Sequence, residues 1–213
     1  MTPERDPRSG LWFVARAPAF AETKRPPLLC FLHGYDEGQP TELVEALTRH
    51  GPLKSDASKR AQAFVVVAPQ LPVRGDYWHR HAKSVRDIVF AMCDRFDADS
   101  ERLYLTGFSY GGNGVFDLAT TSNVAWAALW AVDPTRAPRE PLTQPVWLSV
   151  GEVTRAGLRR FVDALQLVPR APGRKASRVF LDEGEDHVQA ATSAYADPRV
   201  YDWLLEYRAA STS

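Results

Sequence analysis

A glycine-flanked serine is the residue whose type and spacing point most directly to chemistry. Residues 107–111 read GFSYG, and they follow the apolar run 102–106 and precede a helix-like stretch. In a G-x-S-x-G turn between a strand and a helix, backbone strain lifts the serine hydroxyl above the sheet edge. Side chains at Gly107 or Gly111 would collide with neighbouring backbone. The motif predicts that Ser109 is a nucleophile, and the alternative is a glycine turn with a capping serine.

Alternating strand and helix patterns must position that serine. Leu28–Leu32 and Phe64–Ala68 are continuous apolar runs, which are typical of central strands buried on both faces. Apolar residues three and four apart over residues 85–96 predict a helix with one buried face. Further strands are predicted at 11–15, 102–106, 125–132, 145–150 and 177–181, and further helices from Pro40, at 158–165 and at 200–207. The alternation favours an α/β fold with a mostly parallel central sheet and helices on both faces.

Length and sequence composition limit the organisation of the chain. A chain of 213 residues suits one α/β domain, so we expect a single domain over residues 1–213. Residues 1–10 are polar and contain two prolines, and we expect them to be flexible. Cys30 and Cys93 lie in apolar patterns and are interpreted as small core residues rather than a disulfide pair.

The charge balance and hydropathy restrict the partners. Lys+Arg and Asp+Glu number 26 each, so no net field attracts nucleic acid or an acidic membrane. No run approaches the roughly 18 apolar residues that a membrane span needs, and the N-terminal stretch lacks an apolar signal region. We therefore expect a cytoplasmic protein whose partner is a small molecule. The oligomeric state is not predicted.

The motifs and their order resemble the α/β hydrolases, and more narrowly the small phospholipase/carboxylesterase and dienelactone-hydrolase-like esterases. The segments that carry this resemblance are Phe31–Gly34, Val67–Gln70, Leu105–Gly112, Pro145–Glu152 and Ala194–Leu205. The resemblance covers most of the chain from Pro27 onward. It implies the α/β-hydrolase fold with a mostly parallel sheet, and it fixes no substrate.

The resemblance implies Ser109 as nucleophile and His187 as general base. His187 alone among the five histidines follows the last predicted strand, and in this fold the histidine comes last in chain order. A serine hydroxyl is a weak nucleophile until a neighbouring imidazole accepts its proton. We expect His187 in the loop after that strand, and the alternative is a surface histidine beside Glu185 and Asp186.

The resemblance also implies an oxyanion hole made of two backbone N–H groups. These map to Tyr110, which follows the nucleophile, and to Tyr35, in the loop after the early central strand. His33 and Gly34 would shape that loop, and the alternative is an ordinary strand-end turn.

Four residues are expected near the substrate. Gly34 would let the backbone approach the substrate closely, with His33 beside it. Tyr77 and Trp78 would supply apolar walls for the ester side chain, and the alternative is that they pack beneath a surface loop.

The catalytic acid is where the sequence departs from the family pattern. The family usually has an Asp three residues after the glycine that follows the strand at 145–150, and Thr154 occupies that position here. Glu152, on the same loop, is one replacement. Asp133, at the end of the preceding strand and 24 residues after Ser109, is the other, and it resembles the acid of some lipases of this fold. We prefer Asp133; the third alternative is a two-residue site without an acid.

No metal or cofactor is expected. His79 and His81 could form a metal pair, but no carboxylate or thiol cluster of standard spacing completes them. The Pro/Arg-rich stretches at 134–145 and 169–175 are interpreted as surface loops, with a functional cap as the alternative.

Together these residues predict a serine hydrolase that cleaves carboxylic esters or thioesters of small acyl substrates through an acyl-enzyme at Ser109. Short acyl groups are favoured because no long apolar insertion supplies a lid. The alternatives are a serine peptidase-like amide hydrolase, an acyl transferase that uses an alcohol acceptor, and a catalytically impaired hydrolase-fold binding protein.

Overall fold

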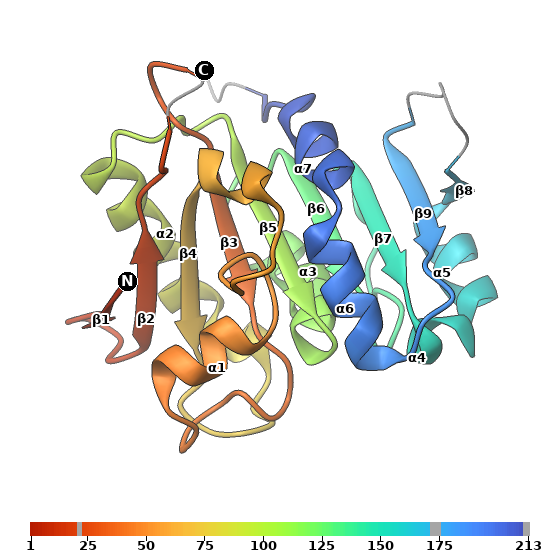
Figure 1. The fold of residues 1–213 in the computed structure, drawn as a ribbon, viewed down its shortest axis with the longest axis horizontal. Helices are drawn as coiled ribbons and strands as arrows, with labels where there is room; N and C mark the ends of the chain where they lie inside the picture. The colour runs from red at the N-terminus through yellow and green to blue at the C-terminus, as the bar shows by residue number, and fades with distance from the viewer. Residues whose placement is uncertain (21–22, 171–175, 211–213) are drawn as a thin grey trace.

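A twisted, mostly parallel sheet forms the centre of the molecule (Figure 1). The computed structural model describes residues 1–20, 23–170 and 176–210. In these ranges the sheet has nine strands in the order β1-β2-β4-β3-β5-β6-β7-β9-β8. The strands are β1 (Thr2–Arg5), β2 (Trp12–Arg16), β3 (Leu28–Leu32), β4 (Val65–Gln70), β5 (Leu103–Phe108), β6 (Ala128–Val132), β7 (Val146–Val150), β8 (Val168–Pro169) and β9 (Arg178–Asp182). Pairing is antiparallel from β1 through β2 to β4 and parallel elsewhere.

Helices cover both faces of this sheet (Figure 1). One face packs against α2 (Ala82–Arg95), α3 (Tyr110–Thr121) and α5 (Leu158–Leu165). The other packs against α1 (Leu43–Arg49), α6 (His187–Ala196) and α7 (Pro198–Leu205). Three shorter elements complete the set, namely α4 (Glu152–Arg155) and the 3-10 helices η1 (Lys59–Ala63) and η2 (Trp78–His81).

Two hydrophobic cores follow from the alternation of side chains along the strands. In β3, Leu28, Cys30 and Leu32 face the α2 side, whereas Leu29 and Phe31 face the α6 side. Every residue of β3 is fully buried. The apolar runs in the sequence therefore mark the strands that are covered by helices on both faces, as predicted.

The N-terminal residues differ from the prediction. Residues 1–10 were expected to be flexible, but Thr2–Arg5 forms β1 and pairs antiparallel with β2, with Thr2 opposite Ala15. β1 is an edge strand with mostly exposed side chains, so its sequence needs no apolar alternation. A polar edge strand of this kind gives no periodic signal. Of the stretch 169–175 interpreted as a loop, residues 171–175 lie outside the described ranges.

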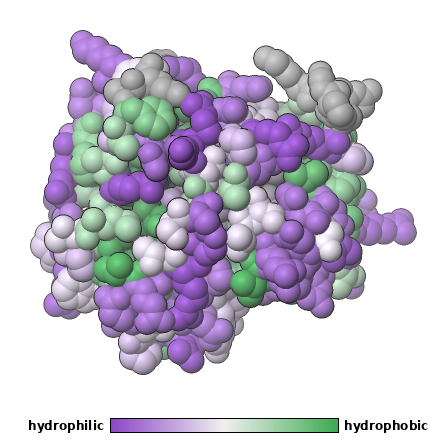
Figure 2. Space-filling view, viewed as in Figure 1, coloured by the Kyte–Doolittle hydropathy of each residue, from purple (hydrophilic) through white to green (hydrophobic). Residues whose placement is uncertain are grey.

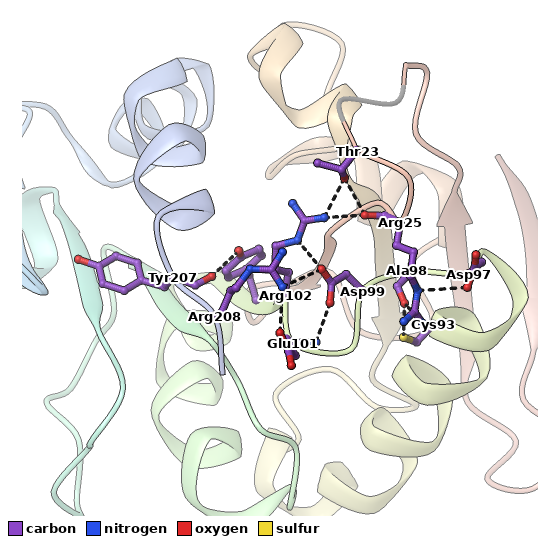
Figure 3. A network of polar contacts seen from close by, with 11 residues as sticks. Thr23, Arg25, Cys93, Asp97, Ala98, Asp99, Glu101, Arg102, Tyr207 and Arg208 are labelled. Atoms are coloured by element: carbon purple, nitrogen blue, oxygen red, sulfur yellow. Dashed lines mark hydrogen bonds and ion pairs between the residues drawn. The ribbon is translucent and has the colours of Figure 1, made fainter. Parts of the chain in front are cut away.

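A network of polar contacts lies at the end of the sheet where strands β3 and β5 begin (Figure 3). The buried Arg102 guanidinium donates to the Asp99 carboxylate (2.8 Å), to the Thr23 hydroxyl (2.8 Å) and to the carbonyl of Arg25 (2.6 Å). Arg208, near the end of the described chain, pairs with Asp99 at 3.1 Å. The network therefore ties the chain before β3, the chain before β5 and the C-terminal segment together.

The surface and the helix lengths complete the description. Figure 2 shows that hydrophilic residues cover most of one face, with hydrophobic residues interspersed among them. Within the described ranges, no helix combines the length and the apolar character that crossing a bilayer requires. The helices are short elements that pack on the sheet.

Candidate active site

Ser109 lies at the turn between β5 and α3. Its backbone has φ 56° and ψ −114°, a region that side chains rarely adopt and that stores about 1–3 kcal/mol of strain. A Cβ at Gly111 would overlap the carbonyl oxygen of Leu32, and one at Gly107 would overlap that of Gly111. The predicted collision is confirmed, and the elbow can close only with glycine at both positions.

His187 is the first residue of α6 and bonds to the serine. Its Nε2 lies 2.9 Å from Ser109 Oγ, and its ring packs on Phe108 with the centroids 4.6 Å apart. The Asp186 carboxylate caps α6 by accepting a hydrogen bond from the Gln189 N–H (2.8 Å). His187 therefore lies at the start of a helix rather than in the predicted loop. The cap holds the first turn of α6 and so fixes the backbone position of His187.

Asp133 holds the other side of the imidazole. Its Oδ2 lies 2.6 Å from His187 Nδ1, and its side chain is fully buried at the end of β6. The backbone N–H groups of Gly151 and Thr154 donate to Oδ1 at 3.0 and 2.8 Å. Burial alone would raise the pKa of Asp133, but the hydrogen bonds from His187 and Thr154 outweigh it and hold the pKa below its ordinary value. The carboxyl is therefore ionised at neutral pH.

The loop after β7 donates hydrogen bonds to the Asp133 carboxylate and does not itself supply the acid that bonds to His187. Glu152 is exposed at the start of α4 and makes no hydrogen bond to His187. Thr154 is buried, and its hydroxyl donates to the carbonyl of Pro134 (3.0 Å). Of the two acids that the sequence left open, the structure brings Asp133 to the imidazole and leaves Glu152 outside.

The two backbone N–H groups predicted for the oxyanion hole belong to Tyr110 and Tyr35. Tyr110 is the first residue of α3, where the N–H has no partner within the helix and the helix dipole favours negative charge. Tyr35 lies in the loop after β3. Within the described chain, neither of these N–H groups donates to a protein acceptor. An oxyanion hole made of these two N–H groups stays a prediction.

His33 holds the loop that carries Tyr35 in place. His33 is buried and neutral, because burial lowers its pKa to about 4 despite its hydrogen bond with the Gly34 carbonyl. Its Nε2 accepts from the Leu71 N–H (2.9 Å), and its Nδ1 donates to the Gly34 carbonyl (2.7 Å). The Trp78 indole donates to the His33 carbonyl (3.3 Å). His33 was predicted beside the substrate, but the structure gives it a supporting place.

Of the two aromatic residues predicted to line the pocket, one is buried and the other is exposed. Trp78 is 1% exposed and packs in the core, whereas Tyr77 is 42% exposed. The Tyr110 ring lies between those of Tyr35 and Tyr77, with centroid distances of 5.5 and 5.9 Å. A Cβ on Gly34 would lie 3.6 Å from Ser109 Cβ, so the backbone there does approach Ser109. Three tyrosine rings thus form one cluster around Tyr110, the residue after Ser109.

A buried carboxyl group beneath the same loop was not predicted. Glu37 is 4% exposed, and its Oε2 lies 2.8 Å from the point that a Cβ on Gly34 would occupy. Burial raises its pKa, and the charge of Arg49, 3.7 Å away, partly opposes the rise. His50 Nε2 is 3.8 Å from Oε1 of the same carboxyl. Glu37 stands in a polar run of the sequence, which gives no sign of burial.

The two histidines weighed as a metal pair have carboxylate neighbours instead. His81 Nε2 is 2.8 Å from Asp76 Oδ2, and His79 Nδ1 is 3.7 Å from Asp117 Oδ2. Among the described residues no group of three or more His, Cys, Asp or Glu side chains is arranged to hold a metal ion.

Comparison with known proteins identifies the fold. No protein-family model matches the chain, and no curated protein matches it. Solved structures do match. A thermostable esterase aligns with 97% of this chain and 62% of its own at 19% identity and a TM-score of 0.69. S-formylglutathione hydrolase from Staphylococcus aureus aligns with 96% of this chain and 94% of its own at 14% identity and a TM-score of 0.63.

A third solved structure extends this likeness. Poly(3-hydroxybutyrate) depolymerase from Bordetella parapertussis aligns with 95% of this chain and 92% of its own at 17% identity and a TM-score of 0.60. The chain has the α/β-hydrolase fold that its sequence predicted. It spans about 62% of the length of the thermostable esterase.

Proposed function

We propose that the protein is a serine hydrolase that cleaves carboxylic esters or thioesters of small acyl groups through an acyl-enzyme on Ser109. One observation carries this proposal. Hydrogen bonds of 2.9 and 2.6 Å connect the Ser109 hydroxyl through the two ring nitrogens of His187 to the buried Asp133. A nucleophile, a base and an orienting acid joined in this way define acyl transfer chemistry on many folds. The names of the three structural neighbours, an esterase, a hydrolase and a depolymerase, support the same class.

The first half of the reaction forms the acyl-enzyme. The Ser109 Oγ attacks the acyl carbon while His187 Nε2 accepts the hydroxyl proton. The ionised Asp133 keeps the proton of the neutral ring on Nδ1 and stabilises the imidazolium as it forms. The imidazolium then gives its Nε2 proton to the leaving oxygen or sulfur, which departs with the electron pair of the broken bond.

The second half returns the enzyme to its starting state. Water attacks the acyl carbon and gives a proton to His187 Nε2, and the ring passes that proton to Ser109 Oγ as the ester bond to the serine breaks. In both halves the negative oxygen of the tetrahedral intermediate is bound by the N–H groups of Tyr110 and Tyr35. Each such donor contributes about 3–4 kcal/mol to transition-state stabilisation.

Covalent labelling tests this proposal. The wild-type protein should react with a fluorophosphonate probe and hydrolyse p-nitrophenyl acetate and butyrate, and Ser109→Ala should lose both properties. Ser122→Ala is the matched control, because Ser122 is a buried serine just past the other end of α3. It should keep labelling and turnover. A wild-type protein that is neither labelled nor active would favour a hydrolase fold that serves only for binding.

The leaving group distinguishes ester from amide hydrolysis. p-Nitroanilides of the same acyl groups should be cleaved far more slowly than the p-nitrophenyl esters. Comparable rates on both would favour the peptidase-like alternative.

A further inference from the structure

A small polar cavity opens beside the residue that follows the nucleophile. Its volume is about 150 Å³, and it lies among η2, α3 and the loop after β6. A cavity of this size holds a group about as large as a benzene ring. Tyr77 and Tyr110 form one part of its wall, and Arg136 and Arg139 form another. Because Tyr110 directly follows Ser109 in the chain, the cavity adjoins the turn that carries the serine.

The cavity wall is fixed before any ligand arrives. The side-chain Oδ1 of Asn113 accepts from the backbone N–H groups of Thr135 and Arg136 at 3.0 and 3.1 Å, and its side-chain Nδ2 donates to the Thr135 hydroxyl at 2.6 Å. The Arg136 guanidinium donates to both carboxylate oxygens of Asp117 at 2.6 and 2.7 Å. The start of the loop is therefore pinned to α3, and the charges of Arg136 and Asp117 neutralise each other.

Arg139 is left with an uncompensated charge. It lines the cavity and is exposed, and it makes no ion pair or hydrogen bond with the residues that the structure describes. Its planar guanidinium offers paired donors whose spacing fits a carboxylate. One unpaired cation suits a singly charged group better than a doubly charged phosphate.

We propose that this cavity binds a carboxylate carried by the ester substrate, with Arg139 as its cation and with Tyr77 and Tyr110 as walls for the segment that leads to the scissile bond. This inference rests on the proposed ester hydrolysis at Ser109. The substrate class is therefore an ester with a free carboxylate a few bonds from the acyl carbon, on the acyl side or on the alcohol side. Arg139 is a specificity-determining residue and takes no part in bond breaking.

Matched substrate pairs test the proposal. Mono-p-nitrophenyl glutarate is compared with p-nitrophenyl pentanoate for the acyl side, and 4-carboxyphenyl acetate with 4-carbamoylphenyl acetate for the alcohol side. We expect the wild-type protein to prefer the carboxylate by about tenfold in kcat/KM in at least one pair, a size typical of a hydrogen bond to a charged group. Arg139→Gln should remove the preference through KM and leave the neutral partner unchanged.

Two further variants make the result specific. Arg139→Lys keeps the charge without the planar fork and should restore part of the preference. Arg159→Gln is the control, because Arg159 is also an exposed arginine, on α5, with a side chain that is 95% exposed. It should behave like the wild-type protein. No preference in either pair, or an equal loss on both members in Arg139→Gln, would overturn the proposal.

Fluorophosphonate labelling of the same samples separates this proposal from the proposed function. Labelled protein without a carboxylate preference contradicts the cavity assignment alone, whereas unlabelled protein contradicts the hydrolase assignment. Calorimetric titration of Ser109→Ala with glutarate and benzoate, with and without Arg139→Gln, reports carboxylate binding when no turnover occurs. Arg139-dependent binding of either acid supports the proposal, and its absence for both contradicts it.

Discussion

The parallel sheet has one edge where β3 and β5 begin and an opposite edge where they end, and these two edges use polar groups in opposite ways. At the edge where β3 and β5 begin, Arg102, Asp99 and Arg208 satisfy one another and the carbonyls around them (Figure 3). At the edge where the same strands end, Ser109 is strained and two backbone N–H groups have no acceptor in the described chain. One edge has completed its hydrogen bonds, and the other keeps unpaired donors and the proposed nucleophile. Stability and chemistry are thus assigned to opposite ends of the same strands.

The largest expected effect concerns Asp133, the proposed acid, at the edge where the strands end. Asp133→Asn keeps the shape of the side chain but removes its charge, and we expect kcat to fall by about 10⁴-fold, as for triad acids in general. Glu152→Gln should change kcat less than twofold, because Glu152 makes no hydrogen bond to His187. Steady-state kinetics on p-nitrophenyl butyrate measures both. Equal, small losses would indicate a site that works without either carboxylate.

The next effect concerns the opposite edge. Arg102→Met removes a buried cation and its hydrogen bonds to Asp99, Thr23 and the Arg25 carbonyl, so we expect the free energy of unfolding to fall by about 3 kcal/mol. The kcat of the folded fraction should stay within twofold. Urea unfolding and kinetics at a temperature where the variant is folded measure the two quantities. Arg159→Met is the exposed control and should cost less than about 0.5 kcal/mol. A large loss of kcat in Arg102→Met would show that the two edges are coupled.

A pH series sharpens the same contrast. Burial would raise the pKa of Asp99, but hydrogen bonds from the Glu101 backbone and from Arg102 hold it below its ordinary value. Ionised Asp99 therefore stabilises the fold above about pH 4, the ordinary pKa of aspartate, and this contribution is lost as the pH falls through the lower pKa of the folded state. Asp99→Asn should cost roughly 1.5–3 kcal/mol at pH 7, and the difference from wild type should shrink towards pH 3. Urea unfolding at stepped pH values tests the sign, which a constant difference would contradict.

The smallest effect isolates the strain at Ser109. Glycine adopts the backbone angles of this position more easily than alanine, so Ser109→Gly should be more stable than Ser109→Ala by about 1 kcal/mol. In a domain of this size that difference corresponds to about 2–4 °C in Tm, measurable by calorimetry. Both variants lack the hydroxyl and should be inactive. A Ser109→Ala variant as stable as Ser109→Gly would mean that the elbow stores no strain.

The sequence predicted the buried centre of the fold better than its edges. The runs at Leu28–Leu32 and Phe64–Ala68 are apolar because both faces of these strands are covered, and that signal needs no knowledge of the rest of the chain. β1 was missed because an exposed edge strand can be polar throughout. α6 was missed as a separate helix because its sequence is rich in alanine and small polar residues and has little amphipathic contrast.

In the candidate site, the sequence predicted the geometry that local structure determines and left open the geometry that depends on distant parts of the chain. Ser109 is recognisable because glycine spacing dictates a turn. The choice between Asp133 and Glu152 depends on which strand end faces His187, and this follows only from the assembled sheet. Burial of Glu37 is likewise a tertiary property, because the side chain lies in a polar run with no pattern of its own.

The loop after β7 has a consequence for how such proteins are found. At the position where the family that the sequence resembles usually carries an aspartate, Thr154 donates its backbone N–H to the carboxylate of Asp133, at the end of the neighbouring strand β6. A sequence motif that requires an acid at that position would discard this chain, although the loop still serves the same imidazole through Asp133. Searches for proteins with this fold should therefore accept an acid at either strand end and require only that the other end can donate hydrogen bonds to it.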